Sequence, residues 1–392
     1  MLLLRSPRAI AEVERDPEPG AASPPESSPP ESSPPNAGRR RRPVLRKAAT
    51  FILIGTAAFL VVAVGLRQLA WSWLGVPYIE VMTEKLDYFR SHAAQYNTVV
   101  VGSSRVFRTI DPPSVEASAA EHGCPGLSVF NFGIPSLSHS EQNYLLQQIL
   151  AARPDNLKRI IFEDALHETR DYINATTPRG RYFHSFRFAA DKLRNIWTYP
   201  ESFGKRLFRT QIFLRAFLYE NSGIGLWSQL SFGKTEEEQP AGKLSLERAG
   251  FLALDNDPDE RLVERHQELL SNYPLFDDMV ALKNGVIGPQ KASERAGYLV
   301  EEAQHLQSAG VQVGLIVPPN PSTLRFTSAI TASVGNKAPN IAIFDYNRKD
   351  TQPSIFQHSL WFDLNHLTEA GATKVSRQFG EDLCAAIKAG KI

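Results

Sequence analysis

The sequence lacks an excess of charge of either sign. Its 392 residues contain 43 Lys and Arg against 42 Asp and Glu, which gives a formal net charge of +1. A chain that binds nucleic acid through its overall charge carries a strong basic excess. The balance therefore excludes a whole-chain polyelectrolyte partner, and we predict that the protein does not bind nucleic acid.

Cysteine is also scarce, because the chain contains only Cys124 and Cys384. Neither has another Cys or a His at the spacing of a zinc site, so we predict no metal and no cofactor. In an oxidising compartment the two thiols can pair, but their spacing does not require it. A disulfide and two separate thiols both stay open.

Apolar residues are few before about Arg42, where Pro, Ser, Glu and Ala dominate. The letters PPESS at 24–28 are repeated at 29–33. Such a stretch has too little apolar surface to offset the entropy lost on ordering. We therefore predict a disordered tail over residues 1–43 with a basic end. A docking site for another protein is the alternative.

The one long uncharged run follows a block of basic residues that ends at Lys47. Residues 48–69 are long and apolar enough for a transmembrane helix, and Trp71 and Trp73 follow where an interfacial aromatic belt would lie. The positive-inside rule places the N-terminus in the cytoplasm and the rest of the chain across the inner membrane. A cleaved signal peptide is the alternative, although its apolar core is usually shorter.

Beyond this span, apolar runs alternate with helical patterns, as in an α/β fold with a parallel sheet flanked by helices. We predict a membrane-proximal linker over 70–96 and one domain over 97–392. The predicted strands are Asn97–Gly102, Leu127–Phe132, Lys158–Phe162, Val311–Val317 and Asn340–Phe344. Ser138 and Glu141 have capping-box spacing ahead of one helix. Val375, Phe379 and Leu383 mark the apolar face of the last one.

Ser103, Ser104 and Gly133 each follow a predicted strand. Ligands of open α/β sheets bind outside the carboxyl ends of the strands, so these residues are expected to share a site. A serine that starts the next helix also lies beside backbone N–H groups that can stabilise an oxyanion. Gly-Ser-Ser is common turn chemistry, and a turn is the alternative.

Asp363 and His366 favour catalysis over a turn. Their spacing lets the carboxylate orient the imidazole, and such an imidazole can accept a serine proton. The other histidines, such as His266 and His305, lie in charged helical stretches and are expected to be caps or solvated surface groups. The sequence therefore predicts an ester-cleaving or acyl-transfer site.

From about Asn97 onward the chain resembles the SGNH/GDSL hydrolase superfamily, which implies a flavodoxin-like sheet. In this resemblance Ser104 is the nucleophile and Ser103 replaces the usual aspartate. Asn131-Phe132-Gly133 matches the second block, where Gly133 and Ser104 give backbone N–H groups to the oxyanion hole. Asp363 and His366 complete the triad. Ser103, Arg105, Asn131 and Asp164 are expected neighbours of the site.

The third block departs from the family, which places an oxyanion-hole asparagine where this chain has Phe162-Glu163-Asp164-Ala165. Three alternatives stay open: a hole made of backbone N–H groups, a protonated Asp164, or weak catalysis. A structural role for Asp164 is favoured, since residues that end a strand often cap the next turn. A metal site at Glu163, Asp164 and His167 is the weakest alternative.

The Gly102–Arg105 variant behind a membrane span resembles an envelope-anchored branch, which includes alginate O-acetylation proteins and the D-alanyl-transfer protein of teichoic acid synthesis. This resemblance implies acyl groups moved onto, or removed from, a cell-surface polysaccharide. It also implies a multi-spanning membrane O-acyltransferase as a partner. Whether water or a sugar hydroxyl takes the acyl group is not settled by the sequence. A non-catalytic scaffold that binds glycan is the alternative.

An insertion over about 175–288 is rich in aromatic and basic residues in its first half. Aromatic faces and guanidinium groups suit an anionic glycan, and the same mixture suits an anionic membrane surface. A helical cap whose aromatics fill a core is the third alternative.

Overall fold

The computed structural model describes residues 41–74, 80–164, 190, 193–194, 196–197, 202–221, 241–281 and 289–392. The chain divides into two compact units, residues 1–58 and 59–392. The predicted disordered tail lies almost wholly outside the described residues. Most of the aromatic and basic first half of the insertion lies outside them as well.

Helix α1, Arg41–Leu74, contains the predicted span. Its segment Lys47–Leu66 is long and apolar enough to cross a membrane. Large apolar side chains along it, such as Phe51 and Val61, are exposed. These features agree with a single membrane span, whereas the orientation of the span stays a prediction.

Five parallel strands form one sheet in the order β2-β1-β3-β4-β5. All five apolar runs identified in the sequence are strands, with ends that differ by at most two residues. In the register, Val100 of β1 lies between Asn131 of β2 and Ile161 of β3. The strands are β1 Thr98–Gly102, β2 Val129–Gly133, β3 Arg159–Glu163, β4 Gln312–Val317 and β5 Ala342–Asp345.

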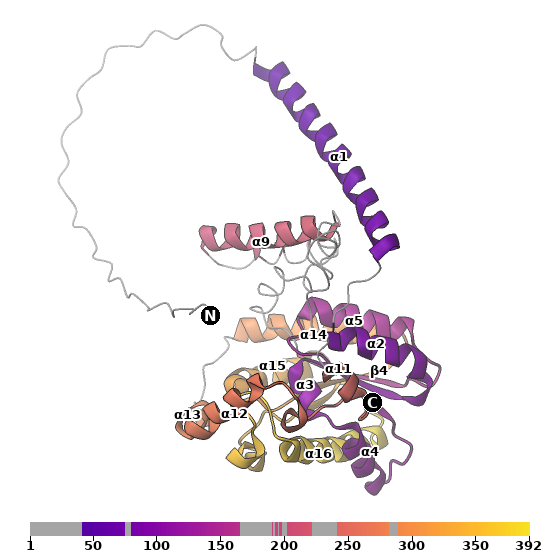
Figure 1. The fold of residues 1–392 in the computed structure, drawn as a ribbon, viewed down its shortest axis with the longest axis vertical. Coiled ribbons are helices and arrows are strands. Elements are labelled where there is room, and N and C mark those ends of the chain that lie inside the picture. The colour runs from indigo at the N-terminus through magenta and orange to yellow at the C-terminus, as the bar shows by residue number, and fades with distance from the viewer. Residues whose placement is uncertain are drawn as a thin grey trace, which may run out of the picture. The chain divides into compact units, whose positions relative to one another are not determined.

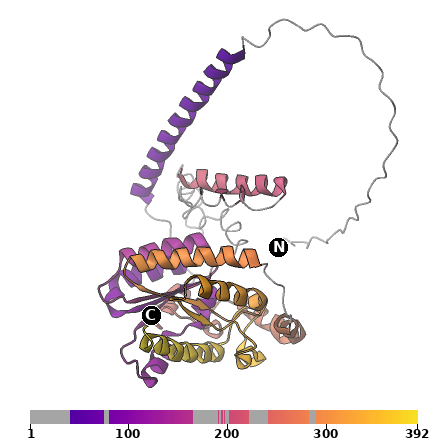
Figure 2. The same cartoon turned by 180° about the vertical axis from the view of Figure 1, so that it is seen from behind.

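Helices cover both faces of this sheet (Figures 1 and 2). One face packs against helices α2 Glu80–His92, α5 His139–Ala151, α14 Pro289–Ser308 and α15 Leu324–Lys337. The capping box of α5 is formed by Ser138 and Glu141, as the sequence predicts. Alternate strand residues such as Val99 and Val101 point into this layer of the core.

The other face of the sheet packs against α4 Pro112–Glu121, α13 Tyr273–Ala281 and α16 Glu369–Lys388. Val375, Phe379 and Leu383 of α16 are fully buried, which confirms the predicted face of the last helix. The remaining helices of the described residues are α3 Ser104–Thr109, α9 Phe203–Asn221, α11 Ala241–Leu246 and α12 Arg261–Ser271. Short 3-10 turns lie at Ala93–Gln95, Leu254–Asn256, Pro321–Thr323, Pro353–Phe356 and His358–Leu360.

The prediction of a linker over 70–96 is wrong from Glu80 onward, because α2 is part of the core. Val81, Met82, Leu86 and Phe89 are buried there, and Lys85 is fully buried beside them. The Lys85 ammonium donates to the carbonyl oxygens of residues 131, 133 and 250 at 3.0, 2.7 and 2.6 Å. Burial, with a smaller contribution from the charge of Arg108, lowers the pKa of Lys85 well below its usual value. The helix therefore anchors the end of β2.

The C-terminal part of the predicted insertion over about 175–288 packs against the domain, and the regular pattern of the sheet resumes with α14 at Pro289. From Ala241 onward, helices α11, α12 and α13 contribute to the domain, and Leu269, Phe276 and Val280 are buried against the sheet layer that contains α16. Charged residues spaced along α12 suggest a solvated helix, but its Leu262 and Leu269 form a buried edge. The segment from 241 to 281 thus belongs to the folded domain.

Cys124 and Cys384 form a disulfide with a Cα–Cα distance of 5.7 Å. Cys124 follows α4 and Cys384 lies in α16, so the bond joins two helices on the same face of the sheet. This resolves the alternative that the sequence leaves open. A disulfide of this kind persists in oxidising compartments.

Candidate active site

The carboxyl end of β1 presents two serines with different roles. Ser103 is the N-cap of α3, and its Oγ accepts the N–H of Arg105 at 3.2 Å. Ser104 is therefore the first residue of the helix, and its side chain lines a cavity. Because serine is a preferred N-cap residue, the local sequence itself places Ser104 at this edge of the sheet.

A tight loop before α16 carries Asp363 and His366. Trp361 and Leu367 form an antiparallel bridge across it, and the Phe362 N–H donates to the His366 carbonyl at 2.9 Å. The Asp363 Oδ1 accepts the backbone N–H groups of residues 365 and 366 at 2.7 and 2.8 Å. The loop therefore fixes the orientation of the carboxylate that contacts the imidazole.

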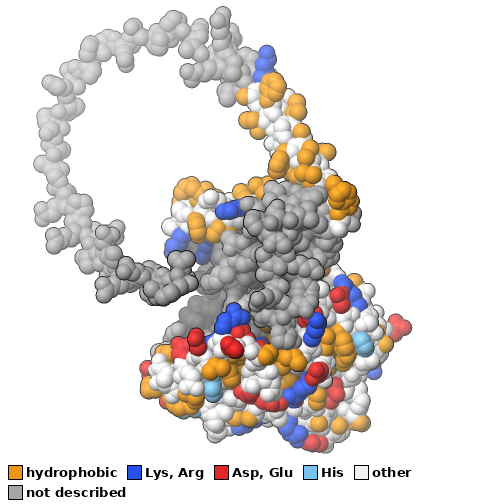
Figure 3. Space-filling model, in the orientation of Figure 1, with side chains coloured by type: hydrophobic (Ala, Val, Ile, Leu, Met, Phe, Trp, Pro, Cys, Tyr) orange, Lys and Arg blue, Asp and Glu red, His pale blue; other side chains and the backbone are white. Residues whose placement is uncertain are grey.

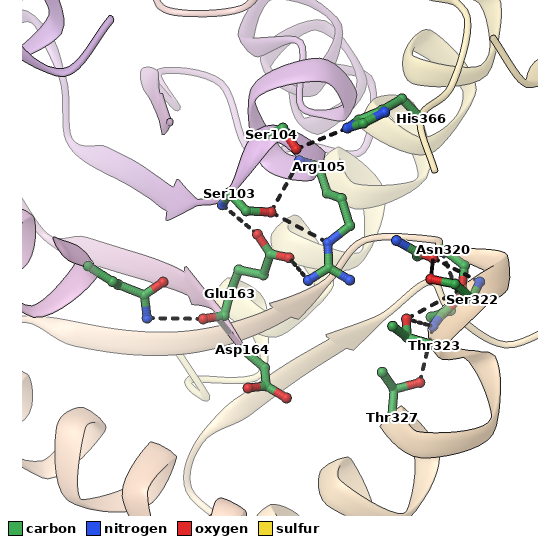
Figure 4. Close-up of polar contacts among 12 residues, drawn as sticks. Ser103, Ser104, Arg105, Glu163, Asp164, Asn320, Ser322, Thr323, Thr327 and His366 are labelled. Carbon is green, nitrogen blue, oxygen red and sulfur yellow. Dashed lines mark hydrogen bonds and ion pairs between the residues drawn. The ribbon is translucent and has the colours of Figure 1, made fainter. Parts of the chain in front are cut away.

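Ser104, His366 and Asp363 form one chain of hydrogen bonds. The Ser104 Oγ lies 2.9 Å from the His366 Nε2, although the two residues are 262 positions apart. The His366 Nδ1 lies 3.0 and 3.1 Å from the two carboxylate oxygens of Asp363. Figure 4 shows the imidazole directed at the Ser104 hydroxyl. This is the arrangement of a nucleophile, a general base and an orienting carboxylate.

The Asp363 carboxyl is held in its ionised form. Burial raises its pKa, but the hydrogen bond from His366 and the positive charges of His366 and Arg265 outweigh burial and lower it below 3.8. A carboxyl whose pKa is lower in the folded state than in the unfolded state stabilises the fold at pH values above its unfolded pKa. This contribution is lost as the pH falls through the folded pKa. We therefore expect the triad to keep its carboxylate throughout the neutral range.

Arg265 is a site residue that the sequence reasoning missed. Its Nη2 donates to the Asp363 Oδ2 and lies 3.3 Å from the His366 Nδ1. It comes from α12, on the same helical edge as the buried Leu262 and Leu269. This spacing is the sequence signal that could have found Arg265. A helical residue three positions after Leu262 and four before Leu269 lies on the same face as both leucines.

The neutral variant Arg265→Met is expected to lower kcat/KM for an ester substrate about tenfold, the effect of losing roughly one charge-assisted hydrogen bond to the triad. The acid limit for keeping Asp363 ionised should move to higher pH, since a positive neighbour is removed. Arg261→Met, on the same helix in an exposed pair with Asp259, is the matched control and should leave kcat/KM unchanged. A positioning role for Arg265 would be contradicted if Arg265→Met and Arg261→Met changed the pH–rate profile of the enzyme equally.

The cavity beside Ser104 has a volume of about 480 Å³ and a wall of mixed polar and apolar character. Three guanidinium groups line it, each paired with a carboxylate: Arg105 with Glu163, Arg108 with Asp257, and Arg265 with Asp363. The full set of lining residues is Ser103, Ser104, Arg105, Arg108, Pro135, Ser136, Leu137, Leu254, Leu262, Arg265, Asn320, Ser322, Thr323, Asn365 and His366. Its size is within the usual range for small-molecule sites.

The predicted oxyanion role of Gly133 is wrong. The Gly133 N–H donates to the Asn131 Oδ1 at 2.7 Å, and a Cβ at this glycine would collide with the backbone of Phe107. The Asn131 amide donates to the carbonyl oxygens of Val106 and Ile110 at 2.9 and 2.5 Å. Asn131 is therefore a buried tie between β2 and α3, and neither residue lines the cavity.

The second predicted oxyanion donor, the Ser104 N–H, lies at the start of α3. Within the part of the chain that the structure describes, no protein group accepts this N–H. The Ser104 N–H stays the predicted backbone donor to an oxyanion at this site.

Glu163 ends β3, in the segment where the sequence departs from the superfamily that it resembles. Its side chain is 1% exposed, accepts the Ser103 N–H at 2.6 Å and pairs with Arg105 (Figure 4). A Cβ at Gly102 would lie 2.6 Å from the Glu163 Oε2, so a glycine leaves room for the carboxylate. An accepting carboxylate cannot donate to an oxyanion. Glu163 instead fixes the turn that carries Ser104.

Asp164 pairs with Arg295 of α14, with Oδ2 at 3.0 Å from Nε, and it does not line the cavity. This contact agrees with the structural role favoured from the sequence, although the partner is another helix rather than the next turn. His167, the third residue of the metal alternative, lies outside the described residues. Among the residues that are described, no group of three or more His, Cys, Asp or Glu side chains is arranged to hold a metal ion.

Asn320 is a further lining residue that the sequence reasoning missed. It follows β4 at the same edge of the sheet, and its Oδ1 accepts from the N–H and hydroxyl of Ser322 at 2.9 and 2.6 Å. Its place after a buried apolar run was the available signal. His266 was expected to be a cap or a solvated surface group; its Nδ1 lies 2.8 Å from the Phe362 carbonyl and its ring stacks on Phe362.

Comparison of the chain with protein-family models, curated proteins and solved structures finds no match. The geometry of the site therefore carries the functional argument by itself.

Proposed function

We propose that this chain is a membrane-anchored serine esterase or O-acyltransferase, in which an acetyl group is transferred from or to a cell-surface polysaccharide. One observation carries the proposal: the continuous hydrogen bonds from the Ser104 Oγ through His366 to Asp363 at the wall of a cavity. Nucleophilic catalysis uses a hydroxyl nucleophile, a histidine base and an orienting carboxylate in this order.

In this mechanism the Ser104 Oγ attacks the ester carbonyl carbon as the His366 Nε2 takes its proton. The carbonyl electron pair moves to oxygen, and the Ser104 N–H is the donor placed to stabilise that charge. The C–O bond to the alcohol then breaks, and His366 returns the proton to the leaving oxygen. An acyl-enzyme on Ser104 remains, with Asp363 stabilising the imidazolium in each half-reaction.

The second half-reaction decides between the two activities. Water attacking the acyl-enzyme gives an esterase, and a sugar hydroxyl gives an O-acyltransferase. In either case His366 removes the proton of the attacking oxygen and Ser104 is regenerated. Polar groups such as Asn320 and Arg108 in the cavity wall suit a hydroxyl-rich acceptor.

The fold supports an SGNH-type assignment. The strand order 2-1-3-4-5 is that of flavodoxin-like sheets, in which ligands bind at the carboxyl ends of the strands. Ser104 follows β1 and the Asp363–His366 loop precedes the last helix, as in the superfamily that the sequence resembles. Glu163 in the third block is a departure from that pattern.

The candidate span and the disulfide support a location in the inner membrane, with the N-terminus cytoplasmic and the catalytic domain periplasmic or otherwise extracytoplasmic. A multi-spanning membrane O-acyltransferase is the proposed protein partner and source of acyl groups. The second candidate function is a glycan-binding scaffold, which is favoured by the engaged Gly133 N–H and the carboxylate of Glu163 in place of two oxyanion donors.

The test is turnover of an activated acetyl ester by the full chain in liposomes, with a soluble polysaccharide added as acceptor. We expect acetate release, acetylation of the glycan, or both, and their ratio assigns the esterase or transferase activity. Circular dichroism and the intact disulfide serve as controls for folding. A folded chain that releases no acetate and transfers none would contradict the enzyme and favour the scaffold.

A further inference from the structure

Helix α9, Phe203–Asn221, carries apolar side chains on two separate faces. On one face Phe213 and Ala216 are buried with Ile196, and Ile212 packs against them. These residues form the buried apolar face with which a surface helix usually packs on its protein.

The second apolar face is exposed. Phe203, Leu207, Leu214 and Leu218 are 68%, 54%, 43% and 45% exposed. With 3.6 residues per turn these four positions fall within about 60° of one another, on the side of the helix away from Ala216. An exposed stripe of large apolar side chains marks a surface that contacts another molecule or a membrane.

Arg206 and Arg215 flank this stripe, each about 90° from its centre around the helix, whereas Lys205 and Arg209 lie toward the opposite face. Lys205, Arg206, Arg209 and Arg215 lie on α9, against the single acidic residue Glu220. Figure 3 shows hydrophobic and basic side chains gathered together on the visible part of α9. Trp197 is half exposed, and its ring meets that of Phe203 edge to face. A leucine and phenylalanine stripe, basic flanks and an exposed tryptophan are typical of a helix that lies in a membrane interface.

We propose that α9 lies in the lipid–water interface of the bilayer, with the stripe of Phe203, Leu207, Leu214 and Leu218 in the acyl-chain boundary and the flanking Arg206 and Arg215 at anionic headgroups. This inference rests on the proposed membrane location, in which the candidate span Lys47–Leu66 holds the same chain at a bilayer. Lipid fits better than glycan, because leucine side chains make no hydrogen bonds to sugars. This contact is independent of the proposed chemistry at Ser104.

The test uses the full chain in liposomes that contain phosphatidylglycerol. The only native cysteines form the disulfide, so an introduced cysteine takes a thiol-reactive fluorophore selectively. Leu207→Cys and Leu214→Cys carry the label on the stripe. The matched control is Val263→Cys on α12, where the native side chain is 62% exposed. Quenching is then measured with lipids that bear bromine in their acyl chains, and separately with aqueous iodide.

We expect brominated lipid to quench the labels at positions 207 and 214 at least about twofold and to spare position 263, as for a helix buried in the acyl boundary. Aqueous iodide should quench the label at position 263 more strongly than the labels at positions 207 and 214. Replacing phosphatidylglycerol with phosphatidylcholine should weaken the lipid quenching, because the basic flanks then lose their partners. Labels that iodide quenches and lipid does not would overturn the proposal. Labels shielded from both quenchers would also overturn it, since they indicate a protein contact.

Discussion

Ser104→Ala is expected to lower turnover of an activated acetyl ester by at least about 10⁴-fold, the scale on which triad members act. His366→Ala should cost about as much, because the Ser104 Oγ is 2.9 Å from the only base in the triad. The double variant should be no slower than either single variant, since residues that act as one unit have non-additive effects. Initial rates of acetate release for the three variants measure this directly.

The control is the neighbouring serine. Ser103 caps α3 with its Oγ, so Ser103→Ala is expected to reduce stability by about 1 kcal/mol while most of the turnover remains. If Ser103→Ala abolished turnover and Ser104→Ala did not, the assignment of Ser104 as the nucleophile would be contradicted. Additive losses in the double variant would mean that Ser104 and His366 act in separate steps.

Glu163→Ala is expected to have the largest effect on stability, lowering the free energy of unfolding by about 3–5 kcal/mol. The variant leaves the Arg105 guanidinium, 8% exposed, without its carboxylate, and it leaves the Ser103 N–H without an acceptor. Glu163→Gln keeps an oxygen for that N–H and should lose less. Urea unfolding of each variant, followed by circular dichroism, provides the comparison.

Asp350→Ala is the matched control, because Asp350 pairs with Arg348 at an exposed position. Exposed ion pairs contribute little, so we expect its unfolding curve to overlay that of the parent chain. Stability unchanged by Glu163→Ala would show that the buried pair does not hold the Ser104 turn. Turnover should fall with Glu163→Ala even under conditions in which the variant stays folded.

The five strands could be predicted from the sequence because each lies in a mainly apolar run. Strands β1 to β4 are buried almost throughout, whereas β5 alternates between buried and half-buried residues. Ser104 and His366 could be predicted because their positions depend on local signals: an N-cap serine before a helix, and a short loop that places Asp363 three residues before the base. Each of these signals lies within a few neighbouring residues.

The remaining features depend on distant contacts. The segment that forms α2 was assigned to a linker, because nothing near Lys85 in the sequence shows that three backbone carbonyls will surround it. The Gly133 N–H was assigned to the oxyanion hole, whereas the Asn131 side chain takes it. Arg265 reaches the triad only because α12 folds back onto the domain.

The most direct test of the account is peptide-mapping mass spectrometry of the full chain after brief exposure to an activated acetyl ester. The account predicts an acetyl group on Ser104 in the wild-type chain and none at this position in His366→Ala, where no base removes the hydroxyl proton. Acetyl groups found only on lysines, or Ser104 labelled equally in both chains, would contradict the triad.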